Sequence, residues 1–159
     1  FVQRGFGIKT EGPIQLTSSF QLNLIGFDHK MRSILDGLNV RFIDWDKETE
    51  VLEMMKFSVG IMPLISTPFN EGKCGFKLVQ YMACSLPTIS SPLVANVKIN
   101  RSGKNLHASS IDEWVYTLKL VHDNIAYFEE IGRDNYSCFK EYYTTEVNFL
   151  SYLSVLRRL

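Results

Sequence analysis

Short apolar segments alternate with amphipathic segments along most of the chain. Segments 20–25 and 40–43 mix apolar and polar residues in the manner of half-buried strands, and segment 57–64 is apolar almost throughout. A continuous apolar run of this length is typical of a strand in a parallel sheet whose two faces are covered by helices. We therefore expect three strands here, with further short strands at 87–90 and 105–108.

Between these segments the apolar residues recur at helical spacing. After the first strand, Met31, Ile34 and Leu35 lie on one face of an expected helix. Asp46 is the expected N-cap of the next helix, because a side-chain oxygen before an apolar periodic segment accepts a hydrogen bond from the first turn. Strands that alternate with helices predict an α/β fold with a Rossmann-like parallel sheet and helices on both faces.

The two ends of the chain differ in pattern. Residues 1–19 mix glycine and proline with polar residues, so we read them as irregular or as a damaged first strand. Residues 110–159 show helical periodicity after Ser110, an expected N-cap, and form a helical C-terminal part. The whole chain, 1–159, is expected to be a single domain, and its first residue, Phe1, suggests a piece of a longer protein.

Composition and charge narrow the class of protein. Hydrophobic residues make up 45% and charged residues 21% of the chain, as in an ordinary globular domain. The 17 basic and 17 acidic residues give no net charge, so no general field attracts nucleic acid. The aromatic residues of segment 127–152 have helical spacing and are better explained by helix packing than by base stacking. No run approaches the roughly 18 apolar residues of a membrane-spanning helix.

Cysteine and histidine usage favours a reducing compartment and gives no metal site. The three cysteines are an odd number without CxxC spacing, which fits the cytoplasm better than a disulfide framework. His29, His107 and His122 are scattered without the spacing of metal ligands, so we expect no bound metal.

The residues that could carry chemistry follow the apolar segment 57–64. A nine-residue loop, 65–73, leads into a helix expected over about 75–84. Gly72 and Gly75 would let the backbone approach a ligand closely, and the N–H groups at a helix start suit a phosphate. Lys73 and Lys77 could add positive charges at the same place. By physics alone a solvated turn is the alternative interpretation.

The wider pattern around this loop resembles a known family. The blocks Ser58-Val59-Gly60-Ile61-Met62-Pro63-Leu64, Gly72-Lys73-Cys74-Gly75-Phe76-Lys77 and Gln80-Tyr81-Met82-Ala83-Cys84-Ser85-Leu86-Pro87-Thr88-Ile89 resemble the GT4-type GT-B glycosyltransferases in composition and spacing. This resemblance implies the C-terminal, nucleotide-sugar-binding half of a GT-B fold. It also implies transfer of a sugar from a nucleotide-sugar donor with retention of configuration and without a metal. The acceptor would bind chiefly to an N-terminal lobe that this chain lacks.

The resemblance also assigns roles to residues. Donor-binding positions are Trp45, Gly72, Lys73, Cys74, Gly75, Phe76, Lys77 and Gln80. Lys77 and Glu71 are the candidate catalytic residues. Many relatives carry two glutamates around this loop, and the corresponding positions here are Gly72 and Gln80, which leaves Glu71 as a displaced candidate for the sugar contact. Gln80 can still bond a ribose hydroxyl, although a neutral amide bonds more weakly than a carboxylate.

The sequence therefore predicts two alternative functions. The first is the donor-binding lobe of a retaining, metal-independent glycosyltransferase for a polysaccharide or another glycoconjugate. Such an enzyme is expected in the cytoplasm, with peripheral association at the inner face of the membrane open to the full-length protein. The isolated chain would bind the donor weakly and transfer nothing. The second is a non-catalytic, Rossmann-like or receiver-like module that binds a nucleotide or phosphate as a regulatory signal.

Overall fold

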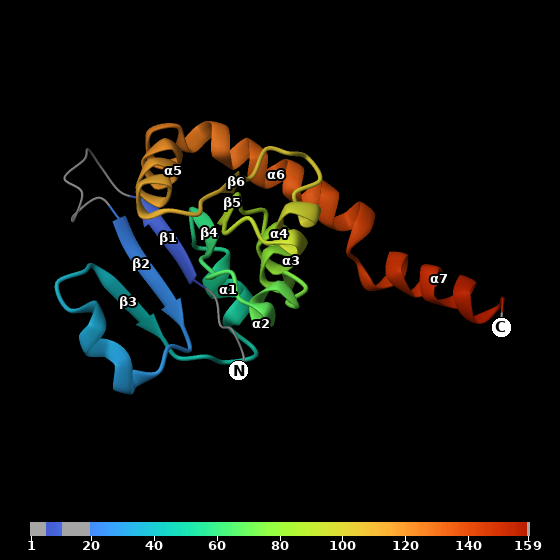
Figure 1. Cartoon of the computed structure of the whole chain (residues 1–159), viewed down its shortest axis with the longest axis horizontal. Coiled ribbons are helices and arrows are strands. Elements are labelled where there is room, and N and C mark those ends of the chain that lie inside the picture. Colours follow the sequence, from blue (N-terminus) through green and yellow to red (C-terminus); the bar gives the residue numbers. More distant parts are fainter. Residues whose placement is uncertain (1–5, 11–19, 159) are drawn as a thin grey trace.

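A single mixed sheet forms the centre of the molecule. The computed structural model describes residues 6–10 and 20–158, and its strands lie in the order β3-β2-β1-β4-β5-β6 (Figure 1). The strands are β1 (Phe6–Thr10), β2 (Phe20–Ile25), β3 (Val40–Ile43), β4 (Val59–Met62), β5 (Thr88–Ser90) and β6 (Leu106–His107). The chain therefore builds the sheet outward from β1 in one direction and then from β4 in the other. The α/β class predicted from the sequence is confirmed.

Strand β1 is the one exception to the parallel arrangement among the described strands. β1 pairs antiparallel with β2, where Phe6 lies opposite Leu24, and antiparallel with β4, where Phe6 lies opposite Ile61. The pairs β2–β3, β4–β5 and β5–β6 are parallel. Only nine residues, 11–19, join β1 to β2, and a parallel crossover needs about a dozen or more. The sequence interpretation of 1–19 as irregular or a damaged strand thus missed a central, reversed strand.

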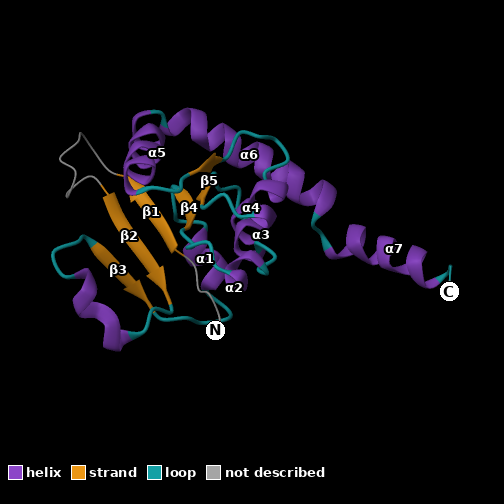
Figure 2. Cartoon of the chain, in the orientation of Figure 1, coloured by secondary structure: helices purple, strands orange, loops and turns teal. Residues whose placement is uncertain are grey.

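Helices cover both faces of the sheet (Figure 2). They are α1 (Glu50–Met54), α2 (Pro68–Glu71), α3 (Phe76–Ala83), α4 (Val94–Ile99), α5 (Ile111–Asp123), α6 (Ile125–Tyr142) and α7 (Thr145–Leu156). Ser110 caps α5 as predicted, and its side chain and that of Glu113 form a capping box. Helix α2 lies inside the loop expected over 65–73 and begins with Pro68, after the N-cap Thr67.

Two expected helices differ from the prediction. The segment after β2 is a 3-10 helix, η1 (His29–Leu35), and it buries none of its residues. Helix α1 begins at Glu50 after Thr49, whereas the Asp46 carboxylate accepts from the backbone N–H groups of Glu48 and Thr49 in the preceding turn. Asp46 therefore caps that turn and not the helix. A local hydrogen bond of this kind competes with helix formation.

Alternating residues of β4 divide the core between the two faces of the sheet. Val59 and Ile61 belong to one cluster of buried residues together with Val121 and Phe128 of the C-terminal helices. Met62 belongs to the other cluster, which residues of α3 complete. This alternation follows from the two-residue period of a strand. The core therefore places α3, the helix of the candidate site, firmly on one face.

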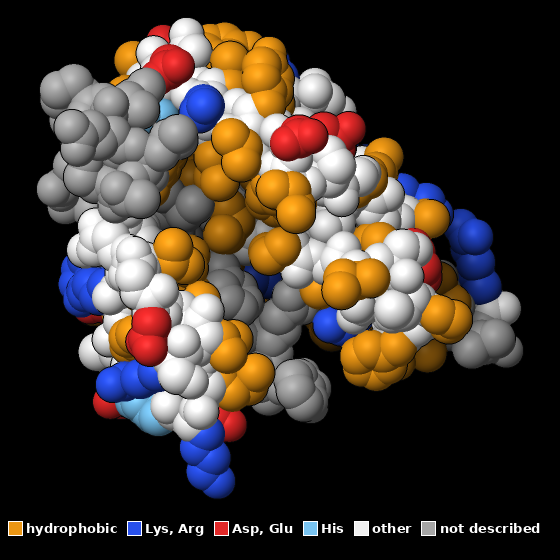
Figure 3. Space-filling view, turned by 60° about the vertical axis from the view of Figure 1, so that its left-hand side comes forward, with side chains coloured by type: hydrophobic (Ala, Val, Ile, Leu, Met, Phe, Trp, Pro, Cys, Tyr) orange, Lys and Arg blue, Asp and Glu red, His pale blue; other side chains and the backbone are white. Residues whose placement is uncertain are grey.

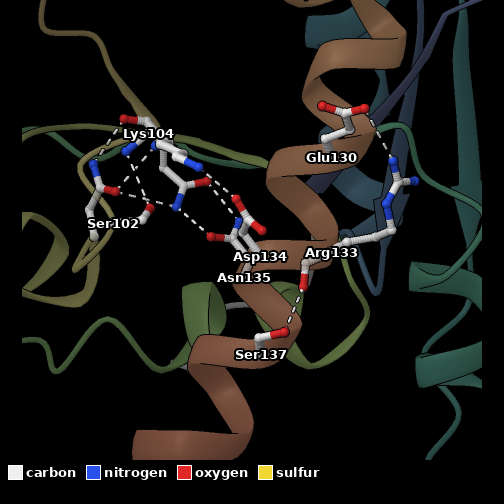
Figure 4. Close-up of polar contacts among 9 residues, drawn as sticks. Ser102, Lys104, Glu130, Arg133, Asp134, Asn135 and Ser137 are labelled. Carbon is white, nitrogen blue, oxygen red and sulfur yellow. Dashed lines mark hydrogen bonds and ion pairs between the residues drawn. The ribbon is translucent and has the colours of Figure 1, made fainter.

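A buried network of asparagines fastens α6 to the loop before β6. Asn105 and Asn135 exchange two side-chain hydrogen bonds of 2.8 Å each. Figure 4 shows Asn135 on α6, facing the loop that carries Ser102 and Lys104. Asn135 also donates to the Leu86 carbonyl, and the Asn105 oxygen accepts from the Thr88 N–H. Both asparagines are more than nine-tenths buried. Because the amide nitrogen and the amide oxygen of each asparagine are both hydrogen-bonded, burying these side chains leaves few polar groups unpaired.

Helix α7 extends away from the rest of the molecule (Figure 1). None of its residues is buried, and Phe149, Leu150 and Tyr152 are all more than half exposed. Hydrophobic side chains also reach the surface elsewhere (Figure 3). The aromatic residues of the C-terminal helices are thus only partly packed, as buried Phe128 and exposed Tyr127 illustrate. In the described residues, no helix is long and apolar enough to cross a membrane.

Candidate functional site

A cleft of about 530 Å³ opens beyond the carboxyl ends of β3 and β4. Its lining contains every residue that the sequence predicted for donor binding, together with Glu50 and Met62. The lining residues are Trp45, Glu50, Met62, Gly72, Lys73, Cys74, Gly75, Phe76, Lys77 and Gln80. Ligands of α/β sheets bind at this edge, near the point where the strand order reverses. Here the order reverses between β1 and β4.

Gly75 shapes the backbone where the loop enters α3. Its φ is +67°, a left-handed conformation that favours glycine, and it occupies the N-cap position. A Cβ at this position would lie 2.5 Å from Cδ1 of Ile99 and 3.1 Å from Oδ1 of Asn96. Gly75 therefore satisfies both a backbone and a packing requirement. The resulting turn presents the start of an eight-residue helix to the cleft.

Lys77 is buried and paired within the cleft. Its Nζ lies 3.1 Å from Oε1 of Glu50, and its side chain is only 8% exposed. The other carboxylate oxygen of Glu50 accepts a 3.0 Å bond from Nε1 of Trp45. The carboxylate thus links Trp45, the start of α1 and the first turn of α3. A phosphate that approached Lys77 would have to compete with Glu50 for the ammonium group.

The remaining lining residues differ in their availability to a ligand. Lys73 is half-buried, and its Nζ lies 5.2 Å from the centre of the Phe69 ring in a cation–π contact. Gln80 is half-buried, and its side chain has no hydrogen-bond partner among the described residues. Phe76 and Cys74 are exposed. Lys73 and Gln80 are therefore the polar side chains best placed to bind an added molecule.

Gly72 leaves open space where many members of the resembling family carry a glutamate. Its φ is −76°, which any residue can adopt, and a Cβ would meet no atom closer than 3.6 Å. The space therefore allows a side chain at this position. The lack of a carboxylate there is a feature of the sequence and is not imposed by the backbone.

Glu71, the second candidate catalytic residue, lies outside this cleft. Its side chain accepts a 2.8 Å hydrogen bond from the Ser66 hydroxyl and lines a neighbouring cleft. The structure therefore brings Lys77 to the predicted site but directs Glu71 to an adjacent one. The resemblance also makes Arg4 and Lys9, near the first strand, candidates to neutralise a diphosphate. Arg4 lies outside the described residues, and Lys9 lies opposite Gln21 in the pairing of β1 with β2, toward the other end of these strands.

The three histidines lie apart and have separate partners. His29 bonds to Asp44, and His122 bonds to Asp123. His107 is half-buried between Ser90 and Asn100, and burial lowers its pKa while the Ser90 contact opposes that shift. Each histidine thus makes ordinary polar contacts at its own place in the fold.

Sequence reasoning missed Glu50 as a member of the site. The two residues of the Lys77–Glu50 pair are 27 positions apart, and α1 brings Glu50 to the cleft. One local signal was available, because Glu50 opens a helix that directly follows the segment with Trp45. An acidic residue is favoured in the first turn of a helix, so from the local sequence Glu50 is explained by helix stability and not by a ligand site.

Chemically, the described residues of the cleft combine two cations, one carboxylate, a helix start and an exposed indole. Such a set can hold an anion beside an aromatic ring, as in a nucleotide. Seven of the eight predicted residues belong to one segment, 72–80, and the fold brings Trp45 to them from the segment after β3. Comparisons of the chain with protein-family models, curated proteins and solved structures find no match.

Proposed function

We propose that this chain is the donor-binding lobe of a retaining, metal-independent glycosyltransferase that acts on a polysaccharide or another glycoconjugate. The observation that supports the proposal is that Trp45 and the predicted segment 72–80 line one cleft at the carboxyl edge of the sheet. The nucleotide base would stack on Trp45, and the diphosphate would lie at the start of α3 near Lys73. Gln80 would bond a ribose hydroxyl.

The same groups would assist the reaction. As the bond between the sugar and the diphosphate breaks, negative charge grows on the departing phosphate oxygen. The N–H groups at the start of α3 and the ammonium groups of Lys73 and Lys77 would stabilise that charge. The acceptor hydroxyl would attack the sugar from the same face, held by the N-terminal lobe. The proposal locates the full-length enzyme in the cytoplasm, including the inner face of the membrane.

Calorimetric titration with UDP, GDP and their sugar conjugates in EDTA tests the proposal. We expect saturable binding of one nucleotide series without metal, weakened several-fold by Lys73→Ala and by Gln80→Ala. The control is Lys140→Ala, because Lys140 is an exposed lysine on α6 that lines neither cleft. Absence of binding at millimolar nucleotide, with the chain folded by circular dichroism, would refute a donor site in this lobe.

A second candidate is a non-catalytic module that binds a nucleotide or phosphate as a signal. The pairing of Lys77 with Glu50 and the glycine at position 72 favour it, because both reduce the contacts available to a reacting sugar. The same titration separates the two functions. A donor lobe should bind a nucleotide-sugar more tightly than the nucleotide alone, whereas a nucleotide-sensing module should not distinguish them.

A further inference from the structure

A second cleft, of about 420 Å³, lies beside the first along the same edge of the sheet. Its lining residues follow three parallel strands, since Pro63 comes after β4, Ser91 after β5 and Ser109 after β6. Among the residues that the structure describes, none lines both clefts. The second cleft is therefore a separate place to bind a ligand, and its volume is within the usual range of ligand pockets, about 300–1,000 Å³.

Several polar groups in this cleft retain bonding capacity. Glu71 uses Oε1 to accept from Ser66, and the described residues place no donor on Oε2. The buried Ser91 hydroxyl accepts from the Leu64 N–H at 2.8 Å, and its own proton has no acceptor among the described residues. The indole N–H of Trp114 likewise has no partner in the described part of the chain. The cleft therefore offers both donors and a charged acceptor.

The charge and the apolar surface of the cleft select the class of ligand. Among the described residues, Glu71 is the only ionisable residue in the lining, so this part of the cleft has none of the cations that a phosphate or nucleotide needs. In addition to its serines, the lining contains two prolines and three aliphatic residues. Trp114 adds an aromatic surface and also packs against the core. A ring with one apolar C–H face and many hydroxyl groups matches this combination. A carboxylate beside an aromatic surface binds such a ring by hydrogen bonds and by contact with its C–H face.

From this arrangement we infer that the second cleft binds an uncharged saccharide unit, with Trp114 and Glu71 as its principal contacts. The inference extends the expectation that Glu71 contacts a sugar, and because it is tested with free saccharides it does not depend on nucleotide binding in the first cleft. Two sources have the same chemistry, a free or acceptor saccharide and the glycosyl group of a donor, and binding measurements on defined variants distinguish them.

The sequence provides a separate reporter for each cleft. The chain has two tryptophans, and Trp45 lines the first cleft while Trp114 lines the second. The Trp45→Phe variant therefore reports only on Trp114, and Trp114→Phe reports only on Trp45. The probes are glucose, galactose, mannose, N-acetylglucosamine and maltotriose. We expect at least one of them to change Trp114 emission saturably with a dissociation constant in the millimolar range, and we expect UDP to leave that emission unchanged.

A carboxylate substitution tests the contact itself. Glu71→Gln should weaken saccharide binding about ten-fold, because a bond to a charged acceptor is about twice as strong as a neutral one. Glu71 is exposed, so this change should leave the fold intact. The matched control is Glu130→Gln on α6, which should have no effect. An unchanged affinity in Glu71→Gln would overturn the assignment.

Saturation-transfer NMR on the unmodified chain gives a second readout. If none of the five saccharides binds at tens of millimolar, the inference is wrong, whatever the first cleft does. If Glu71→Gln weakens UDP-glucose relative to UDP, the bound unit is the donor's own glycosyl group. If it weakens only the free saccharides, the unit is a separate saccharide. Loss of UDP binding in Lys73→Ala reports on the first cleft alone, so the two proposals fail independently.

Discussion

The contact between Gly60 and Tyr81 supports the helix that carries the first cleft. Gly60 lies in the middle of β4, and Tyr81 lies in α3 with its side chain fully buried. A Cβ on Gly60 would lie 2.3 Å from Cγ of the Tyr81 ring and 2.4 Å from Cδ2. The ring is also held at its far end, where the hydroxyl donates to the Ile61 carbonyl at 3.3 Å. We predict that Gly60→Ala is strongly destabilising.

The magnitude follows from the distance. Ordinary contacts begin at 3.4 Å, so the ring or the strand would have to move by about 1 Å, and overpacking of this kind typically costs 1–3 kcal/mol. Because a buried ring cannot swing into solvent, we expect the upper end, about 3 kcal/mol. For a chain of this length that corresponds to a fall in Tm of roughly 6–12 °C.

Urea unfolding followed by circular dichroism measures the effect. The control is Gly72→Ala, because Gly72 has an ordinary φ and a Cβ there would meet no atom closer than 3.6 Å, so its cost should stay within about 0.5 kcal/mol. In the double variant Gly60→Ala/Tyr81→Leu the clash is absent, so the two costs should be less than additive by at least about 1 kcal/mol. Additive costs, or a Gly60→Ala variant as stable as the unmodified chain, would refute the reasoning.

Four further predictions concern the site and the buried polar groups. Glu50→Gln should bind UDP several-fold more tightly in calorimetry, because Lys77 loses its competing carboxylate; equal or weaker binding would contradict this. Gly72→Glu should fold normally and raise the affinity for UDP-glucose relative to UDP, and an unchanged ratio would argue against a donor sugar at this loop. Asn135→Ala should lower the free energy of unfolding, measured in urea, by about 1–3 kcal/mol, because it leaves buried groups of Asn105 and Leu86 without a partner. Ser137→Ala, on the exposed face of α6, should leave that free energy unchanged. Burial lowers the pKa of His107 in the folded chain. Its contribution to stability is therefore complete above about pH 6.5 and is lost as the pH falls below that value. Between about pH 7.5 and pH 5, the His107→Gln variant should lose less of its free energy of unfolding than the unmodified chain.

Local chemistry explains what could be predicted from the sequence. The strands β2 and β3 were predicted with their observed bounds, and the cap at Ser110 was correct because the capping box is built from neighbouring residues. The segment that lines the first cleft was identified for a similar reason, since its glycines and lysines lie within one loop and one helix start. These features need no knowledge of distant contacts.

The features that were missed depend on distant parts of the chain. The direction of β1 follows from pairing with both β2 and β4, although the nine residues between β1 and β2 already argued against a parallel crossover. The role of Glu50 depends on a contact with a helix 27 residues further on. The 3-10 helix at 29–35 has a helical apolar pattern but buries none of its residues, so its pattern alone could not make it an α-helix.

The reversal of β1 leaves the two clefts intact for a structural reason. In the described residues, every lining residue lies at the end of β4, in a segment that follows β3, β4, β5 or β6, or in a helix after one of them, and none comes from β1. These four strands run in the same direction, so their carboxyl ends meet at one edge whatever β1 does. Among the described lining residues along that edge, the cations Lys73 and Lys77 lie in the first cleft, and Glu71 is the one charged residue of the second. Since a nucleotide needs the cations and an uncharged saccharide does not, the two clefts are suited to different ligands, and a single loop, 65–73, stands between them.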